Sequence, residues 1–205
     1  MTSQDIEKLV STSATSQGGS RQVILLKNTA IKFPMKLSKL DIRGLSHQDI
    51  FEKARNGNSY DVYHSGNSED EHIDSIDWLV QNGIEQTLAE WDIWNNCPEY
   101  LRHLLCPILE YGFTDTGIPY TIMEKAETFT TWGSNLGEIC FEDFITEHFN
   151  FTPLEKNKLI SEMILLSQMC HFEASDIFNN CSNVGKLNEK FVIIDYGWGH
   201  YNWLG

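Results

Sequence analysis

The sequence predicts an α+β fold, with most strand patterns before residue 125 and the clearest helix after residue 152. Short apolar, β-branched runs bounded by turn residues are typical of strands, and they occur at residues 24–26, 29–33, 107–113, 120–124 and 191–194. The helix start is Thr152-Pro153-Leu154-Glu155, where Thr can cap, Pro can take the first helical position and Glu can complete a capping box. One buried helix face is then predicted by the four-three-four spacing of Leu159, Met163, Leu166 and Cys170.

The last fifth of the chain holds a candidate metal site. The apolar run 191–194 is followed by Asp195, Tyr and Gly, and the loop upstream of it contains Asp176 and Asn183. Carboxylate and amide oxygens are ligands for a hard divalent cation. A carboxylate that closes an apolar strand is also costly near a core unless a cation or hydrogen bonds compensate it. We therefore expect Asp195 and Asn183 to hold a metal ion.

The first third of the chain predicts a hairpin and a polar insertion. A Gly18-Gly19-Ser20 turn precedes the strand at 24–26, residues 27 and 28 form the next turn, and the strand at 29–33 carries Lys32. Residues 1–17 are expected to be a flexible lead-in whose first ten residues could form a short helix. Residues 34–77 are interpreted as an insertion with a short helix near 46–55. A solvated loop is the interpretation of its acidic cluster, Glu69, Asp70, Glu71, Asp74 and Asp77.

A helix is predicted over residues 84–94, between this insertion and the strand pair at 107–113 and 120–124. It contains two carboxylates that could reach a lysine, Glu90 and Glu85. Glu90 is preferred because Leu88, Trp91 and Trp94 surround it with apolar anchors. The sequence of elements is therefore hairpin, insertion, helix, strand pair, capped helix, polar loop and final apolar strand.

In this order and spacing, the motifs resemble those of the protein-kinase-like superfamily. The resemblance covers most of the chain, which is similar to minimal, truncated kinase-like proteins of phage, viral or bacterial-effector type. It implies one bilobal domain: an N-lobe with a small antiparallel sheet over residues 18–126, and a reduced helical C-lobe over 127–205. It also implies ATP bound between the lobes and a Mg²⁺ or Mn²⁺ ion.

The resemblance assigns a role to each candidate residue. A shortened glycine-rich loop corresponds to Gly18, Gly19 and Ser20, Lys32 would contact the ATP phosphates, and Glu90 would orient that lysine. Met123 lies near the gatekeeper position, and residues 124–126 correspond to the hinge, so Met123, Glu124 and Ala126 are expected to line the nucleotide. Asp176 would be the catalytic base, and Asn183 and Asp195 the metal ligands.

Two departures from the family pattern are visible in the sequence. Kinases place the metal-binding Asn five residues after the catalytic Asp, whereas Asn183 follows Asp176 by seven. Either the loop has a two-residue insertion, or Phe178 occupies the Asp position, or Asn180 is the metal ligand instead. In addition, Gly205 is only ten residues past Asp195, which leaves no room for an activation segment or for the helices that bind a protein substrate.

Composition narrows the possible partners. The formal net charge of −14 argues against binding of nucleic acid through its phosphates and against an anionic membrane surface. The chain has five cysteines but no Cys-x-x-Cys pair, and it has no apolar stretch near the N-terminus. These features predict reduced thiols in a cytoplasmic protein. The resemblance to viral and effector proteins implies that it acts in a host cell. No run approaches the 18 apolar residues of a membrane span.

The leading functional hypothesis is therefore an ATP-dependent phosphotransferase, a minimal protein kinase that transfers the γ-phosphoryl group to a protein hydroxyl. The alternative is a catalytically impaired pseudokinase that works as a protein-binding or inhibitory module. A small-molecule kinase is disfavoured because such chains usually carry a larger C-terminal lobe around the substrate. The spacing between Asp176 and Asn183 is the sequence feature that separates the first two hypotheses.

Overall fold

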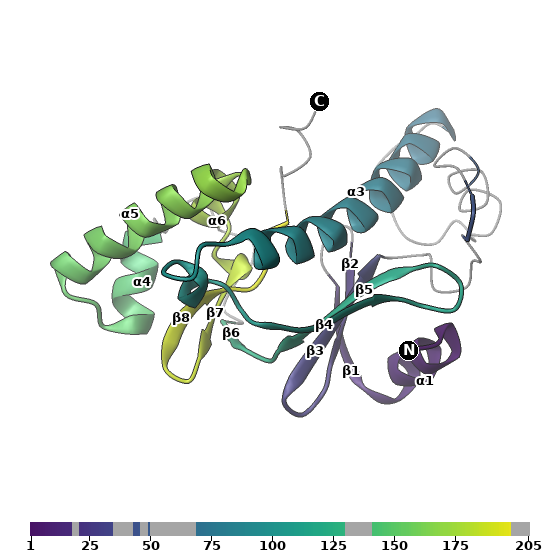
Figure 1. Cartoon of the computed structure of the whole chain (residues 1–205), viewed down its shortest axis with the longest axis horizontal. Coiled ribbons are helices and arrows are strands. Elements are labelled where there is room, and N and C mark those ends of the chain that lie inside the picture. Colours follow the sequence, from purple (N-terminus) through teal and green to yellow (C-terminus); the bar gives the residue numbers. More distant parts are fainter. Residues whose placement is uncertain (18–20, 35–42, 46–48, 50–68, 130–140, 198–205) are drawn as a thin grey trace. The chain divides into compact units, whose positions relative to one another are not determined.

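The computed structural model describes residues 1–17, 21–34, 43–45, 49, 69–129 and 141–197 (Figure 1). These residues form an α+β fold, as the sequence predicts. The chain divides into two compact units: unit 1 comprises Met1–Leu88 and Ile108–Met123, and unit 2 comprises Ala89–Pro107 and Glu124–Gly205. The chain therefore passes from one unit to the other after residues 88, 107 and 123. The last of these passages coincides with the start of the predicted hinge.

Unit 1 is built on a five-stranded sheet with the order β1-β2-β3-β5-β4. The predicted hairpin is confirmed as β2 (Arg21–Leu25) and β3 (Thr29–Pro34), which pair antiparallel and close where the Leu26 amide donates to the Thr29 carbonyl at 2.9 Å. The predicted strand pair is confirmed as β4 (Ile108–Phe113) and β5 (Pro119–Glu124), also antiparallel.

The N-terminal segment contains the short helix that its first ten residues could form, and the part after this helix, expected to be flexible, is a strand. Helix α1 (Ser3–Thr12) is fixed by a capping box in which Thr2 and Asp5 bond reciprocally, and β1 (Ala14–Gln17) pairs antiparallel with β2. The cause is a non-local contact: Ile6 of α1 is fully buried against the sheet. Met1, Leu9 and Val10 pack against the same cluster, and the polar, Ser/Thr-rich composition of the segment conceals these apolar contacts.

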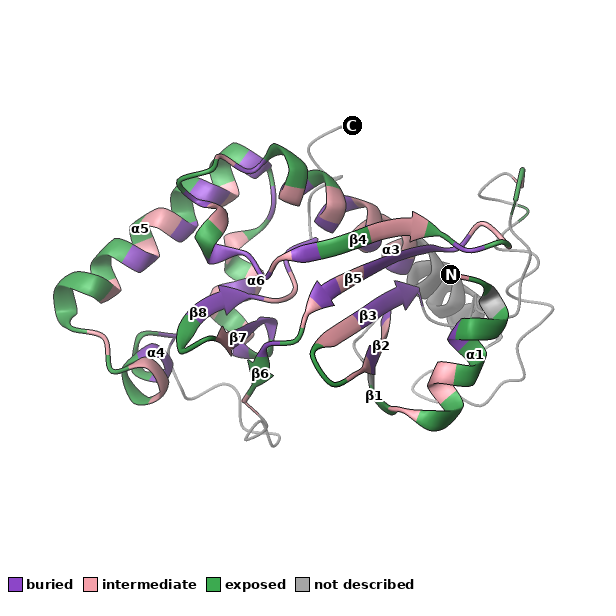
Figure 2. Ribbon diagram, turned by 60° about the horizontal axis from the view of Figure 1, so that its bottom comes forward, coloured by how far each residue is buried: buried purple, intermediate pink, exposed green. Residues whose placement is uncertain are grey.

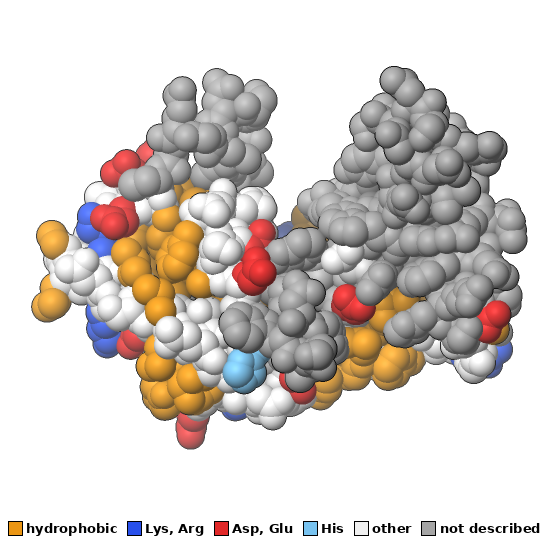
Figure 3. Space-filling model, turned by 90° about the horizontal axis from the view of Figure 1, so that it is seen from above, with side chains coloured by type: hydrophobic (Ala, Val, Ile, Leu, Met, Phe, Trp, Pro, Cys, Tyr) orange, Lys and Arg blue, Asp and Glu red, His pale blue; other side chains and the backbone are white. Residues whose placement is uncertain are grey.

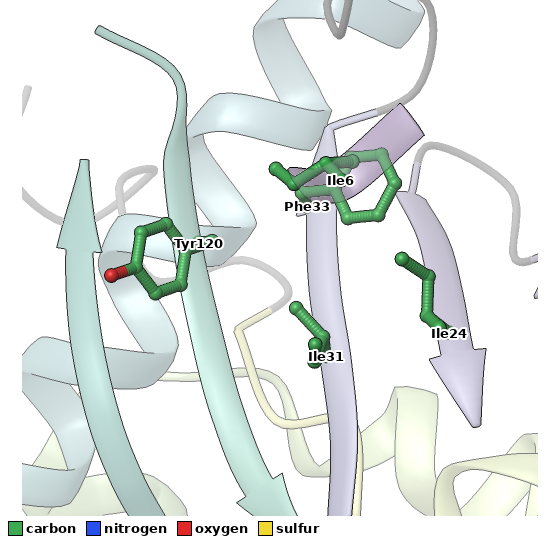
Figure 4. Close-up of a cluster of buried hydrophobic side chains, with 5 residues drawn as sticks. All are labelled: Ile6, Ile24, Ile31, Phe33 and Tyr120. Atoms are coloured by element: carbon green, nitrogen blue, oxygen red, sulfur yellow. The ribbon is translucent and has the colours of Figure 1, made fainter. Parts of the chain in front are cut away.

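One face of the sheet carries the core of unit 1. Figure 4 shows this cluster, which consists of Ile6, Ile24, Ile31, Phe33 and Tyr120. Because side chains alternate along a strand, Lys32 points to the opposite face from its neighbours Ile31 and Phe33. The same alternation from Tyr120 along β5 places Met123 on that opposite face. Lys32 and Met123 therefore share one face of unit 1, on neighbouring strands.

Gly112 of β4 makes room for the Tyr120 ring, which lies across it. A Cβ at Gly112 would lie 2.8 Å from the Tyr120 hydroxyl oxygen, and this hydroxyl donates a hydrogen bond of 2.7 Å to Glu110 Oε1. Burial and the Glu110 carboxylate raise the pKa of Tyr120 to about 12, so Tyr120 stays a hydrogen-bond donor at all physiological pH values. The close strand-to-ring packing thus depends on the glycine.

Helix α3 (Glu69–Asn96) begins much earlier than the sequence predicts. The acidic cluster, interpreted as a solvated loop, lies in the N-terminal part of this helix, so that interpretation is wrong. Carboxylates near a helix N-terminus interact favourably with the helix dipole, which makes an acidic sequence compatible with a helix start. Of the predicted short helix at 46–55, only residue 49 is among the described residues.

Unit 2 combines a three-stranded sheet, in the order β6-β7-β8, with helices. Its sheet consists of β6 (Glu127–Thr128), β7 (Val184–Leu187) and β8 (Lys190–Ile193). Its other elements are η1 (Arg102–Leu104), α4 (Phe141–Phe149), α5 (Pro153–Cys170), α6 (Ala174–Asn179) and η2 (Cys181–Asn183).

The capping box of α5 and its predicted buried face are both confirmed. The Thr152 amide donates to Glu155 Oε2 at 2.8 Å, and the Glu155 amide donates to Thr152 Oγ1 at 3.3 Å. The buried residues of α5 are the four predicted ones, Leu159, Met163, Leu166 and Cys170, and Figure 2 shows buried and exposed positions alternating along the helix. Other large hydrophobic side chains of α5, including Leu154 and Met169, are exposed to solvent. Hydrophobic side chains also appear on the molecular surface in Figure 3, which shows the face seen from above.

None of the described helices combines the length and the apolar character needed to cross a membrane. This finding concerns the described part of the chain only.

The hairpin of β7 and β8 is set by a two-residue turn. Asn188 and Glu189 both have positive φ angles, 50° and 63°, as a type I′ turn requires. The resulting register pairs Val184 with Ile193 and Leu187 with Lys190. On the other side of β7, Gly185 pairs with Thr128.

Gly185 provides a test of this packing, because a Cβ there would lie 2.9 Å from the Glu127 carbonyl oxygen and 3.0 Å from the Ala126 Cβ. We expect Gly185→Ala to lower the free energy of unfolding by about 1–3 kcal/mol, and Gly185→Val to lower it further. Intrinsic strand preference alone would favour Val over Ala and Gly. Urea unfolding of the wild type, Gly185→Ala and Gly185→Val therefore separates steric crowding from strand preference. A Gly185→Val protein as stable as the wild type would contradict steric crowding.

Candidate functional site

The candidate site begins where α5 ends. His171 follows the last residue of α5 in a left-handed conformation with φ 55° and ψ 52°, and both its amide and the Phe172 amide donate to the Ser167 carbonyl. Phe172 is buried. This left-handed cap interrupts the helix, so α5 does not run straight into Asp176 as expected from the sequence; the short helix α6 comes between.

Asp176 lies in the first turn of α6 and not in an open loop. Its amide donates to the Glu173 carbonyl at 3.2 Å. Its Oδ2 accepts a hydrogen bond of 2.6 Å from Asn183 Nδ2, and the same amide nitrogen lies 3.4 Å from the Asp176 carbonyl oxygen. The seven-residue spacing therefore still brings the two side chains together, because α6 and η2 fold the intervening residues back.

Asn183 also connects this turn to the end of β8. Its carbonyl oxygen accepts from the Ile194 amide at 2.7 Å and from the Asp195 amide at 3.2 Å. Asn183 is buried, with 7% of its surface exposed. Asp195 follows β8 directly and is half-buried. Asp176, Asn183 and Asp195 thus converge within unit 2.

The electrostatics of the two carboxylates show that they lie near each other. Burial and, after it, the negative charges of Asp195 and Glu173 together raise the pKa of Asp176 to about 6, against the lowering effect of the Asn183 hydrogen bond. Two like charges in a partly desolvated site disfavour each other's ionised form. A divalent cation between them would remove this cost, because it favours both carboxylates in their charged form.

The structure distinguishes among the alternatives that the sequence leaves open for the loop. Asn180 Oδ1 accepts from both the amide and the hydroxyl of Ser182, so Asn180 acts as the cap of η2. Its Nδ2 lies 3.5 Å from Asn183 Oδ1, at the outer limit of a hydrogen bond. Phe178 packs edge-on against Phe141 with ring centroids 5.1 Å apart. Asp176, and not Phe178, is therefore the residue that meets Asn183.

A further pair of residues holds Asp195 in place and is not evident from the sequence. The Cys106 amide donates to the Ile193 carbonyl at 2.9 Å, and the Tyr196 hydroxyl donates to the Cys106 carbonyl at 3.2 Å. The Tyr196 side chain is almost completely buried, with 1% exposed. The Ile193 backbone before Asp195 and the Tyr196 side chain after it are thus both bonded to Cys106. In the sequence, only the hydroxyl-bearing aromatic at position 196 hints at this arrangement.

The predicted hinge residues lie at the junction of the two units. Met123 is buried and ends unit 1, and Ala126 is 9% exposed in unit 2. The Glu124 amide donates to the Pro107 carbonyl at 3.0 Å, and the Glu124 carbonyl accepts from the Cys106 thiol at 3.2 Å. Both backbone groups of Glu124 therefore have partners inside unit 2.

The remaining predicted nucleotide residues are distributed over both units. Lys32 is buried in unit 1, and Glu90 is completely buried in unit 2. Glu85, the alternative to Glu90, is only half-buried. Because a buried charge requires compensation, Glu90 is the more constrained of the two. Gly18, Gly19 and Ser20 lie outside the described residues.

Among the described residues there is no group of three or more His, Cys, Asp or Glu side chains placed to hold a metal ion. Asp176, Asn183 and Asp195 form a different donor set, two carboxylates and one amide, of the all-oxygen kind that suits Mg²⁺ or Mn²⁺. The chain matches no protein-family model, no curated protein and no solved structure.

The raised pKa of Asp176 predicts a pH-dependent stability. Because the folded-state pKa is about 6 and the ordinary value is 3.8, ionisation of Asp176 destabilises the fold as pH rises from about 4 to 6, and the cost is complete above 6. We expect Asp176→Asn to stabilise the metal-free protein at pH 7.5 and not at pH 4. A full shift of this size corresponds to roughly 3 kcal/mol; partial solvent exposure of the carboxylate reduces the expected gain to about 1 kcal/mol.

Thermal unfolding in EDTA at the two pH values measures this difference, which amounts to roughly 2–4 °C for a chain of this length. Glu147→Gln, at an exposed position of α4, is the matched control, with no expected change at either pH. Equal melting temperatures of wild type and Asp176→Asn at pH 7.5 would mean that hydrogen bonding already compensates the charge.

Proposed function

We propose that this protein is a metal-dependent phosphotransferase of the protein-kinase-like type. The observation that carries the proposal is the convergence of Asp176, Asn183 and Asp195, with the Asn183 side chain on Asp176 at 2.6 Å and the Asn183 carbonyl on the Asp195 amide at 3.2 Å. A base beside two oxygen ligands for a divalent cation is the arrangement that phosphoryl transfer requires. The reaction would pass the ATP γ-phosphoryl group to a protein hydroxyl.

In this proposal each residue of unit 2 has a distinct task. Asp195 and the Oδ1 atom of Asn183 would hold Mg²⁺ or Mn²⁺, because Asn183 Nδ2 is engaged by Asp176 and leaves Oδ1 facing away from it. The cation would neutralise charge on the phosphates of ATP. Asp176, with its pKa of about 6, is ionised at pH 7.5 and can accept the proton of an attacking hydroxyl.

The resemblance to kinases supplies the other assignments. Lys32 would contact the ATP phosphates, Glu90 would orient Lys32, and Met123, Glu124 and Ala126 would lie along the nucleotide. The burial of Lys32 and Glu90 supports a specific role for both charges, because uncompensated buried charges are costly. These roles stay predictions.

A second candidate function is a pseudokinase that binds a protein partner. The observation that favours it is the placement of Asp176 inside α6, hydrogen-bonded to Asn183, since a base engaged within a helix is less open to a substrate hydroxyl. Under this alternative the metal site would be retained and transfer would be lost. The two candidates therefore differ in turnover and agree in cation binding.

Cation binding is tested by thermal shift. We expect millimolar Mn²⁺ or Mg²⁺ to raise the melting temperature by several degrees, because a ligand that binds only the folded state stabilises it by mass action. Asp195→Asn and Asn183→Ala should lose this metal-dependent increment, whereas Asp143→Asn, at an exposed position of α4, should keep it. An Asp195→Asn protein that retains the full increment would remove Asp195 from the metal site.

Phosphoryl transfer is tested with radiolabelled ATP, using the protein itself and a cell lysate as acceptors. Asp176→Ala should lower the transfer rate by about 10²–10⁴-fold while leaving the metal-dependent thermal shift intact. Lys32→Ala should remove the additional shift caused by ATP and keep the shift caused by metal alone. Wild-type protein that shows both shifts but no transfer with either metal would favour the pseudokinase.

A further inference from the structure

The segment that follows α3 runs along the C-terminal half of α5 in the opposite direction. Three side-chain pairs define this packing: His103 with Glu162, Tyr100 with Met169, and Cys97 with Cys170. Each step back along the first segment corresponds to a step forward along α5. The two segments are therefore antiparallel, and the thiol pair is the last of the three contacts.

The contacts on either side of the thiols are close. His103 Nε2 lies 3.4 Å from Glu162 Oε2, and the Tyr100 hydroxyl lies 3.3 Å from Met169 Sδ. At the end of this row the side chains of Cys97 and Cys170 are hydrogen-bonded to each other. Both thiols are shielded from solvent, with 2% and 4% of their residues' surfaces exposed.

From this geometry we propose that Cys97 and Cys170 form an oxidation-sensitive pair, which hydrogen peroxide converts into a disulfide that joins the end of α3 to the end of α5. This modification site is independent of the proposed function. Cys106 and Cys181 are also reduced and buried. The Cys97 and Cys106 thiols both lie near a backbone carbonyl, 3.5 Å from Pro98 and 3.2 Å from Glu124, and Cys97 is chosen because it also bonds the Cys170 thiol.

The chemistry proceeds in two balanced steps. The Cys97 thiolate attacks one oxygen of the peroxide, an S–O bond forms, the O–O bond breaks, and the hydroxide that leaves takes up the thiol proton as water. The Cys170 sulfur then attacks Cys97, an S–S bond forms, the S–O bond breaks, and hydroxide leaves with the Cys170 proton as water. Two thiols are oxidised by two electrons in total, and one peroxide is reduced to two waters.

Cys97 is the thiol that reacts first. The hydrogen bond from Cys170 and the positive charge of Arg102 lower the pKa of Cys97, whereas its bond to Cys97 and burial raise the pKa of Cys170. Arg102 is held there because its Nη2 donates to the Cys97 carbonyl at 3.1 Å. Thiolates are the reactive form, and Cys97 directly follows the last residue of α3, where helix ends open readily.

The crosslink would act on the segment that leads to the candidate site. Cys170 is the last residue of α5, and Asp176 lies six residues further along the chain. Linking Cys97 to Cys170 closes a long loop, which restricts the unfolded chain and stabilises the folded one. It also fixes the end of α5 from which α6 starts.

The test is a hydrogen peroxide titration of the full-length protein, followed by non-reducing peptide mapping by mass spectrometry. We expect loss of two thiols, a mass decrease of about 2 Da, a Cys97–Cys170 linked peptide, and a melting temperature raised by several degrees. Hydrogen exchange should slow at residues 97–104 and 163–173. Dithiothreitol should reverse all of these changes.

Cys97→Ser and Cys170→Ser should each abolish the linked peptide and the thermal shift, and Cys106→Ser should keep both. Should Cys97→Ser fail to fold, Cys97→Ala and Cys170→Ala provide the same comparison. A linked peptide that joins any other pair of cysteines, sulfinic or sulfonic acid at Cys97 without a crosslink, or two unmodified thiols at peroxide concentrations that oxidise Met169 would overturn the proposal.

Discussion

Asn183 is the residue on which the arrangement of the candidate site depends. Its side chain bonds Asp176 of α6, and its carbonyl oxygen accepts from the Ile194 and Asp195 amides after β8. The register of the β7–β8 hairpin pairs Val184 with Ile193, so Asn183, one residue earlier, must lie opposite Ile194. The left-handed pair Asn188 and Glu189 fixes that register. A two-residue turn at the far end of the hairpin thus determines which residue meets Asp195.

Local signals in the sequence are sufficient for the elements that depend on near neighbours. The capping box at Thr152 and the spacing from Leu159 to Cys170 predict α5 and its buried face because both are read within one helix. The hairpin of β2 and β3 is predictable for the same reason, since a short turn joins two apolar runs. Asp195 stands out because a carboxylate after an apolar strand conflicts with its surroundings.

The parts that the sequence does not predict depend on distant contacts. α1 is held by Ile6 against strands that follow it in the chain, and the bond from Tyr196 to Cys106 spans 90 residues. The sequence does not reveal that Asp176 lies in a helix, because residues 174–179 are too few to show the 3.6-residue spacing of apolar side chains. It also does not reveal the left-handed cap at His171, because glycine, the residue that usually marks such a cap, is absent from this position. A five-residue spacing in an open loop is not what this chain has: α6 and η2 bring Asp176 and Asn183 together across seven residues.

The overall charge and the local donor set together favour a particular order of binding in the proposed reaction. A chain with a formal net charge of −14 attracts divalent cations and repels free ATP over distances of about a Debye length. Near Asp176 the repulsion is local as well, because Asp195 and Glu173 already raise its pKa. Phosphate groups cannot approach two carboxylates until a cation lies between them. The metal ion would therefore bind first, or arrive with ATP as one complex, and by neutralising Asp195 it would lower the pKa of Asp176 and keep this carboxylate ionised.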